Sequence, residues 1–439
     1  MQLAKDWSGG RVVLTSAALA LLLGAAVLGM IFTVHAQSSG TINETWVDQM
    51  TAQWQPTQYH QMSFGAMVIP ASYDQIEYPF NNLQVLSGYL NVMDGSGAGY
   101  IRIDVGFDAW LSNNKTVQSE LQSLVGQAKS AGKGFILADA SAEAYRPLSK
   151  RLPWSEFKQA WVQRVTTLAA FFHPEYYEVV KEPGWYLPMI SDATTNPQVS
   201  DPNQWLGLTQ NLTNAVHSVS PNTKVGVAIA ADSLNNSPTL YVAYLEGLSK
   251  ITGLNFMGFD LYTTTGFTAT QSYLSQHGNG GLAVWIAECW SATDATTAYD
   301  SSRATLDANW IKAQYYFAQT ENASMMIPFF TNTFASYSLA ETTPTDPSQI
   351  LNLLQQRTPV FSMYQGITAG LENIPKGSTA TTSFTTTSGQ SSSTLQTTTG
   401  STAPPPSSGN FPTEEVAIGA IAVVLVLVIV GYLATRKRG

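Results

Sequence analysis

Eight short apolar segments recur along this chain of 439 residues, and each is followed by a stretch long enough to form a helix. Runs of this length, rich in Val, Ile and Phe, are typical of buried strands. The expected strands are residues 64–69, 100–105, 134–139, 177–182, 224–229, 256–262, 282–288 and 325–330. Eight strands that each precede a helix fit a (β/α)8 TIM barrel, an α/β fold.

The stretches between the strands carry apolar residues at helical spacing. One stripe is Val117, Leu121, Leu124, Val125 and Ala128, a second is Phe157, Trp161, Leu168 and Phe172, and a third is Leu306, Trp310, Ala313 and Phe317. A doubly wound open sheet is the alternative, but it usually has a Gly-rich turn after its first strand. The Gly-rich loop at residues 95–99 precedes a strand instead, which is the wrong order for a phosphate site. No cofactor is therefore predicted.

Apolar segments near both ends of the chain predict membrane segments. Residues 12–34 are almost wholly apolar and lead to a small-residue cleavage site before Gln37, so residues 1–36 form a signal peptide or an uncleaved N-terminal anchor. Residues 416–434 are an unbroken apolar run, which predicts a transmembrane helix. The basic residues within 435–439 then form a cytoplasmic tail.

The remaining segments divide into a domain and a stalk. Residues 376–412 are rich in Ser and Thr and close with three prolines, so we expect an unfolded stalk that carries O-linked sugars. Residues 40–375 form the one folded domain, an ectodomain outside the cell. Five Asn-x-Ser/Thr sequons suit an external glycoprotein: Asn43, Asn114, Asn211, Asn235 and Asn322. The expected location is the cell membrane, with a single membrane pass.

Charge and cysteine usage exclude several classes of function. The formal net charge is −9, which argues against a nucleic-acid partner because such partners require basic patches. The single cysteine, Cys289, permits no intrachain disulfide. It fits a small apolar residue at a strand end better than a thiol nucleophile, since no His is placed to activate it. The His residues are scattered, so no metal site is predicted.

Two of the expected strands end in a glutamate. Glu288 ends the strand at 282–288, and Glu182 ends the strand at 177–182 just before Pro183. Simple alternation places Glu288 on the same face as Val284 and Ile286. A lone buried carboxylate is costly, so each of these two must meet solvent, a partner or a substrate. Retaining glycoside hydrolysis requires two carboxyl groups, and two strand ends in one domain could supply them.

Other polar and aromatic residues gather near the same strand ends, where a barrel of this kind carries its active site. The polar residues are Arg102, Asp104, Asp139, Tyr262 and Asn332. Trp110, Trp185, Tyr186 and Trp290 follow strand ends and could supply apolar platforms for sugar rings. The alternative for each aromatic residue is a place in a loop core. The alternative for Arg102 is a structural ion pair with Asp104 or Asp139.

Four of these strands carry motifs of a known group. Residues 176–183, with the sequence YYEVVKEP, resemble the fourth-strand motif of the clan A retaining (β/α)8 glycoside hydrolases, the clan of cellulases, mannanases and related glycanases. Residues 285–288, WIAE, resemble the clan's seventh-strand nucleophile motif. Arg102 resembles the second-strand Arg that bonds the nucleophile, and Tyr262 the sixth-strand Tyr near it.

The resemblance implies a retaining glycoside hydrolase that cleaves β-linked polysaccharide or glycan by double displacement. The expected membrane helix and stalk would place this enzyme at the cell surface. Glu182 would be the general acid/base and Glu288 the nucleophile, with carboxyl groups about 5–5.5 Å apart. The residues expected to bind substrate are Arg102, Asp139, Lys181, Trp185, Tyr262, Trp290 and Asn332. The alternatives are a non-catalytic glycan-binding surface protein or adhesin on a decayed barrel, and a cell-surface transglycosylase.

Lys181 departs from the clan pattern, which has Asn before the acid/base to bind the sugar 2-hydroxyl. Adjacent strand residues face opposite sides, so Lys181 could point away from the cleft. If it points inward, its ammonium group would lower the pKa of Glu182 and favour activity at low pH. The eighth strand is a second departure, because it carries Phe329 and Phe330 where many members have Trp.

Overall fold

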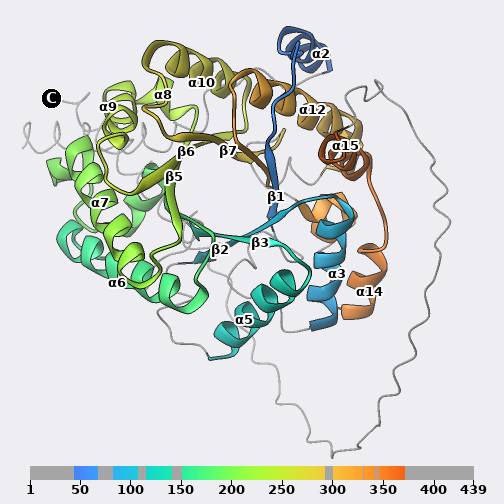
Figure 1. Cartoon of the computed structure of the whole chain (residues 1–439), viewed down its shortest axis with the longest axis horizontal. Helices are drawn as coiled ribbons and strands as arrows, with labels where there is room; N and C mark the ends of the chain where they lie inside the picture. The colour runs from blue at the N-terminus through green and yellow to red at the C-terminus, as the bar shows by residue number, and fades with distance from the viewer. Residues whose placement is uncertain are drawn as a thin grey trace, which may run out of the picture. The chain divides into compact units, whose positions relative to one another are not determined.

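The eight strands form a closed barrel in chain order, each parallel to its neighbours (Figure 1). This computed structural model describes residues 44–67, 83–106, 115–140, 151–291, 300–329, 331–341, 344 and 346–370. The strands are β1 (Ser63–Met67), β2 (Tyr100–Gly106), β3 (Gly134–Ala140), β4 (Tyr176–Lys181), β5 (Lys224–Ala230), β6 (Leu254–Leu261), β7 (Ala283–Cys289) and β8 (Met325–Pro328). The barrel is confirmed, the open doubly wound sheet is wrong, and every strand lies within two residues of its predicted bounds.

A helix follows each strand and packs on the outside of the barrel (Figure 1). The main helices are α3 (Leu83–Gly95), α5 (Lys115–Ser130), α6 (Trp154–Phe172), α7 (Pro202–Val219), α9 (Pro238–Leu248), α10 (Thr264–His277), α12 (Ala304–Thr320) and α15 (Pro359–Thr368). Shorter elements are η3 (Pro183–Met189), η4 (Pro197–Ser200), α8 (Ser233–Asn236), η5 (Ser301–Arg303), η6 (Thr331–Phe334), α13 (Ser338–Glu341) and α14 (Pro347–Leu353).

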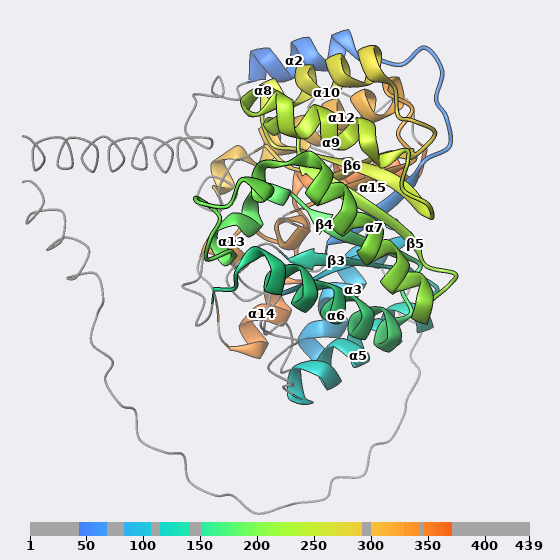
Figure 2. The same ribbon diagram turned by 90° about the vertical axis from the view of Figure 1, so that its left-hand side faces the viewer.

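The helix α2 (Glu44–Gln53) precedes the barrel and lies beside α10 and α12 (Figure 2). Trp54, just after α2, stacks on Phe267 of α10 with ring centroids 5.3 Å apart. Trp46 of α2 lies 5.3 Å from Trp310 of α12. These aromatic contacts join the start of the described chain to the last third of the barrel.

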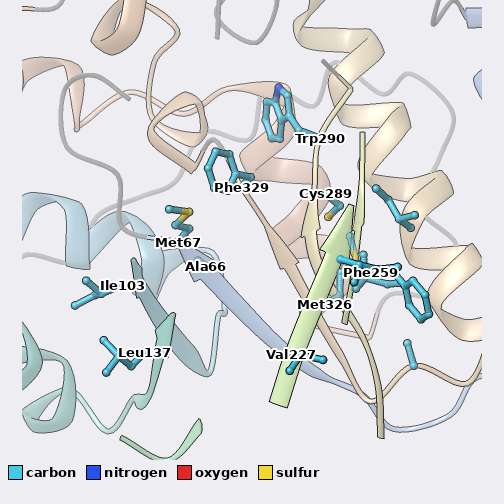
Figure 3. Packing of buried hydrophobic residues seen from close by; sticks show 14 of the residues in the cluster. Ala66, Met67, Ile103, Leu137, Val227, Phe259, Cys289, Trp290, Met326 and Phe329 are labelled. Atoms are coloured by element: carbon cyan, nitrogen blue, oxygen red, sulfur yellow. The ribbon is translucent and has the colours of Figure 1, made fainter. Parts of the chain in front are cut away.

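The barrel has a large outer core and a smaller inner one. The outer core lies between strands and helices and contains Val227, Phe259 and Cys289 (Figure 3). The inner core fills the barrel with Ile136, Ala228, Phe256, Trp285, Ala287, Met325 and Ile327. Phe256 and Trp285 stack there with centroids 3.7 Å apart, and Tyr100 and Tyr176 pack against this inner core from the starts of their strands. The amino-terminal end of the barrel interior is therefore apolar, which leaves the carboxyl ends of the strands for polar groups.

The strands that carry the candidate catalytic residues are irregular. The pairing of β4 with β5 shifts between Glu178 and Val180, and the pairing of β6 with β7 shifts between Phe259 and Asp260. Val284 and Ile286 belong to the outer core, whereas the Glu288 side chain reaches Arg102 among the interior residues. The expected common face of Glu288 with those two residues is therefore wrong, because simple alternation fails at a shift in register.

The expected membrane segments fall outside the described residues, as does the stalk. This holds for residues 1–36, 376–412, 416–434 and 435–439. Within the described ranges, each helix is too short or too polar to cross a bilayer. The terminal membrane segments stay predictions.

We predict that Gly226→Ala lowers the free energy of unfolding by about 1–3 kcal/mol, as overpacking does. A Cβ atom at Gly226 of β5 would overlap the ring of Phe256, which is already stacked on Trp285. The matched control is Gly207→Ala in α7, where a Cβ meets nothing within 4 Å. That change should raise stability by about 0.5–1 kcal/mol, because alanine is the better helix former. Denaturant unfolding measures both, and equal stability of the two variants would contradict a packed interior.

Candidate active site

Charged side chains collect at the carboxyl-terminal half of the barrel interior. The cluster contains five carboxyl groups and two cations, drawn from β2, β4, β6 and β7 and from the residue after β4. Its members are Arg102, Asp104, Glu178, Lys181, Glu182, Asp260 and Glu288. Six of them are buried and Glu182 is partly exposed. We call these seven residues the interior charge cluster.

Arg102 contacts three acids of the interior charge cluster. Its Nε donates to Asp104 Oδ1 at 2.8 Å, and its Nη2 donates to Glu288 Oε1 at 2.7 Å. Its Nη1 donates to the carbonyl oxygen of Ala287 at 2.6 Å and lies 3.4 Å from Glu178 Oε2. Arginine stays protonated in proteins, so a fully buried guanidinium needs such partners. The predicted contact with Glu288 is present together with the alternative one to Asp104.

Lys181 points into the barrel, which decides between the two orientations that the sequence left open. Its Nζ lies 2.6 Å from Asp104 Oδ2 and 2.5 Å from Glu288 Oε1. The register shift in β4 explains the orientation, because it lets both Glu178 and Lys181 reach the interior across an odd spacing. The ammonium group also lies 5.1 Å from the centre of the Phe329 ring.

Three polar groups contact the Glu288 carboxyl group. Besides Arg102 and Lys181 on Oε1, the Tyr262 hydroxyl donates to Oε2 at 2.5 Å. Burial, followed by the charge of Glu288, raises the pKa of Tyr262 well above its ordinary value, so the phenol keeps its proton. Two cations and a hydroxyl thus surround one carboxyl group, an arrangement that suits a carboxylate nucleophile.

Glu182 has the opposite environment. Burial and then the charge of Glu288 raise the pKa of Glu182 to about 8, and Lys181 offsets only part of that rise. The expectation that Lys181 holds the pKa of Glu182 below its usual range is therefore wrong, since desolvation and the neighbouring carboxylate outweigh the ammonium group. Glu182 also has a positive φ of 48°, which directs the chain from β4 into η3 at Pro183. Such backbone strain in a residue other than glycine is concentrated at functional sites.

Two buried carboxyl groups of the cluster, Glu178 and Asp260, were not among the residues predicted from the sequence. Burial raises the pKa of Glu178 to about 7 even though Arg102 lies beside it. Burial, with Glu288 next, raises the pKa of Asp260 well above its ordinary value. Within the described ranges, neither carboxyl group accepts a hydrogen bond. Each breaks an otherwise apolar strand, and a lone acid inside such a strand is the signal that could have revealed them.

The acids of the interior charge cluster differ in the direction of their pKa shifts. Burial alone would raise the pKa of Asp104, but Arg102 and then Lys181 bring it below its usual range. Asp104 and Glu288 lie against the two cations. The other three acids, Glu178, Glu182 and Asp260, have raised pKa values. The two candidate catalytic positions therefore differ, because Glu288 contacts two cations and a hydroxyl whereas Glu182 has a raised pKa.

The remaining predicted residues have different outcomes. Trp290 is fully buried and belongs to the outer core (Figure 3), which favours its place in a core over an open sugar platform. Asn332 is buried in η6, where its Oδ1 accepts from the Thr333 amide at 3.1 Å. The side chains of Asp139 and Trp185 and the whole of Trp110 lie outside the described part of the chain. Phe329 packs on Tyr262 with centroids 6.0 Å apart, where many clan members carry Trp.

Two other kinds of site find little support among the described residues. Cys289 is buried, and burial raises the pKa of its thiol well above the ordinary value, so it is a core residue and a poor nucleophile. No group of three or more His, Cys, Asp or Glu side chains in the described ranges is arranged to hold a metal ion.

The fold matches solved glycoside hydrolase structures. No protein-family model matches this chain, and no curated protein matches its sequence. The fold is similar to that of an exo-β-1,4-mannosidase from Opitutaceae bacterium strain TAV5, with a TM-score of 0.50 and 11% identity over 72% of this chain and 60% of the mannosidase. This chain thus spans less than two thirds of the mannosidase's length.

Two further structures match less well. A glucosidase from Croceicoccus marinus has a TM-score of 0.47 and 16% identity, over 72% of this chain and 69% of its own. Xylanase 10B from Thermotoga maritima has a TM-score of 0.45 and 10% identity, over 74% of this chain and 99% of its own. The resemblance to the clan A barrels is confirmed at the level of the fold, and at these identities it extends no further.

We predict that the protein is most stable at mildly acidic pH. Glu178 and Glu182 keep protons in the folded chain up to pKa values of about 7 and about 8, whereas an unfolded glutamate loses its proton near about 4.3. Because the folded chain binds more protons over this range, the free energy of unfolding falls as pH rises, by up to about 1.4 kcal/mol per pH unit for each group. Asp104 has a lowered pKa and so acts in the opposite direction, losing its contribution at low pH.

Thermal unfolding followed between about pH 4 and about pH 8 tests this linkage. Glu178→Gln should flatten the decline toward high pH, because it removes one of the groups that must lose a proton. The control Glu156→Gln, an exposed position in α6, should leave the curve unchanged. A melting temperature that rises steadily across this range would contradict the protonated interior.

Proposed function

We propose that this protein is a retaining glycoside hydrolase that cleaves β-linked polysaccharide or glycan by double displacement. The observation that carries the proposal is the contrast between the surroundings of two carboxyl groups at the carboxyl ends of β4 and β7. Glu182 keeps a proton up to a pKa of about 8, and Glu288 is held by Arg102, Lys181 and Tyr262. A retaining glycosidase requires this pair, one protonated acid and one ionised nucleophile.

Proximity of the two groups supports the same proposal. After burial, Glu288 is the largest cause of the raised pKa of Glu182, which fits two carboxyl groups that lie near each other. A separation of about 5–5.5 Å would fit direct attack by Glu288, whereas a longer one would admit a water and lead to inversion. The fold shared with the mannosidase structure adds a β-mannoside to the first substrates to test.

In the first step Glu288 would attack the anomeric carbon while Glu182 protonates the departing oxygen. The bond to the leaving group breaks and a glycosyl ester forms. In the second step Glu182 would accept a proton from a water molecule that attacks the same carbon, and the ester bond to Glu288 breaks. Two inversions give net retention.

Single substitutions separate these two roles. Glu288→Gln should abolish turnover of all glycosides, because an amide cannot form the ester. Glu182→Ala should lose about 10²–10⁴-fold on substrates with poor leaving groups, which need the acid. It should keep activity on 2,4-dinitrophenyl β-glycosides, whose leaving group needs no proton, and added azide should speed turnover and yield a β-glycosyl azide.

The control for these variants is Glu175→Ala, an exposed position next to the amino-terminal end of β4. It should have normal kcat on the same substrates. Initial rates and product configuration by NMR are the measurements. Wild-type rates in both Glu288→Gln and Glu182→Ala would place any activity elsewhere, and an α-glycosyl product would contradict double displacement. Binding of glycan without any turnover would instead favour the glycan-binding alternative.

We also propose that the barrel is displayed outside the cell by the helix at 416–434. The support is the sequence: basic residues at both ends favour the cytoplasm, and a Ser/Thr-rich stretch separates the barrel from the apolar run. Protease added to intact cells should release the catalytic domain by cutting within residues 376–412. Permeabilised cells are the control, and a domain cut only after permeabilisation would rule out the external location.

A further inference from the structure

The two oxygens of the Glu288 carboxylate have different surroundings. Oε1 lies 2.7 Å from Arg102 Nη2 and 2.5 Å from Lys181 Nζ. Oε2 accepts from the Tyr262 hydroxyl at 2.5 Å and, among the residues that the structure describes, from no other side chain. Two cations therefore hold Oε1 in place, and Oε2 keeps the lone pair that can reach a sugar carbon.

Lys181 is held rigidly in this position. It is buried, its ammonium group also lies 2.6 Å from Asp104 Oδ2, and the Phe329 ring packs over it. The shift in register of β4 turns it toward Glu288. The clan pattern has a neutral Asn at this position. An ammonium group beside the nucleophile is therefore a feature of this chain.

We propose that Lys181 is a positioning residue that stabilises Glu288 as the departing carboxylate and so accelerates the second step of the reaction. This inference rests on the proposed glycosidase activity. In the first step Oε2 forms a bond to the anomeric carbon, the bond to the leaving oxygen breaks, and Glu182 gives that oxygen its proton. Glu288 loses its negative charge in this step.

In the second step the charge returns. Water forms a bond to the anomeric carbon and gives its proton to Glu182, while the bond between that carbon and Oε2 breaks. An ammonium group beside Oε1 stabilises the carboxylate that leaves. The same charge makes Glu288 a weaker nucleophile in the first step. Lys181 thus slows formation of the glycosyl ester and speeds its hydrolysis, so the ester does not accumulate.

The test follows the ester directly in the full-length protein. The substrates are the 2,4-dinitrophenyl β-glycosides of mannose, glucose and xylose, whose first step needs no acid. The wild type should release dinitrophenolate at a constant rate with no initial burst. Lys181→Met should give a burst of about one equivalent per active site, with kcat lowered by about tenfold and kcat/KM changed much less. Intact-mass analysis of quenched samples should then show the mass of one attached sugar.

Three more variants complete the test. Lys181→Gln is also uncharged, should show the same burst, and serves if Lys181→Met does not fold. Lys181→Arg restores a cation and should remove the burst. Lys224→Met changes an exposed lysine at the start of β5, next to the amino-terminal end of β4, and should behave as wild type.

The outcomes separate the inference from the proposed function. Uncharged variants that turn over with a lower kcat/KM and no burst would overturn the role of Lys181, and the glycosidase activity would stand. A wild-type protein that hydrolyses none of the glycosides would overturn the proposed function and this inference with it. A burst in the wild type equal to that of Lys181→Met would show that the ammonium group does not govern the second step.

Discussion

The interior of this barrel depends on the pairing of one guanidinium group that has no contact with solvent. Arg102 cannot lose its proton, so its burial has to be offset by carboxylates that the surrounding strands supply. Asp104 comes from the same strand, Glu178 from β4 and Glu288 from β7. Asp104 and Glu288 contact both cations, and the other three acids have raised pKa values. The contacts that stabilise the buried guanidinium also give the two candidate catalytic groups different surroundings.

Departures from regular strand geometry place these groups. The pairing shifts in β4 and between β6 and β7 fall beside Lys181 and Glu288, and Glu182 takes a left-handed backbone conformation. A regular β4 would direct Glu178 and Lys181 to opposite faces of the sheet, and one of them would be lost from the cluster. Bulges are common next to active sites because they re-aim a side chain without disturbing the rest of the sheet. Here the shifts let Glu178, Lys181 and Glu288 reach charged partners inside the barrel.

Much of the fold could be predicted because it rests on local pattern. The strands are short apolar runs, and the helix stripes such as Phe157, Trp161 and Leu168 are buried as expected. The pairing of Arg102 and Tyr262 with Glu288 came from the resemblance to the clan. The orientation of Lys181 and the face of Glu288 depend on shifts in register, which leave no trace in the periodicity of one strand. Glu178 and Asp260 were missed because their protonation depends on burial that only the assembled barrel provides.

The contact between Arg102 and Glu288 joins residues 186 positions apart in the chain. During synthesis Arg102 leaves the ribosome before Glu288, so this contact cannot form until Glu288 has been made. At about 5–20 residues per second, the interval is roughly 10–40 s. Over that time the strands β2 to β6 cannot close around the guanidinium without leaving it short of its strongest distant partner. The nascent barrel therefore stays open on one side until β7 emerges, and its apolar strand faces are exposed to chaperones for that interval.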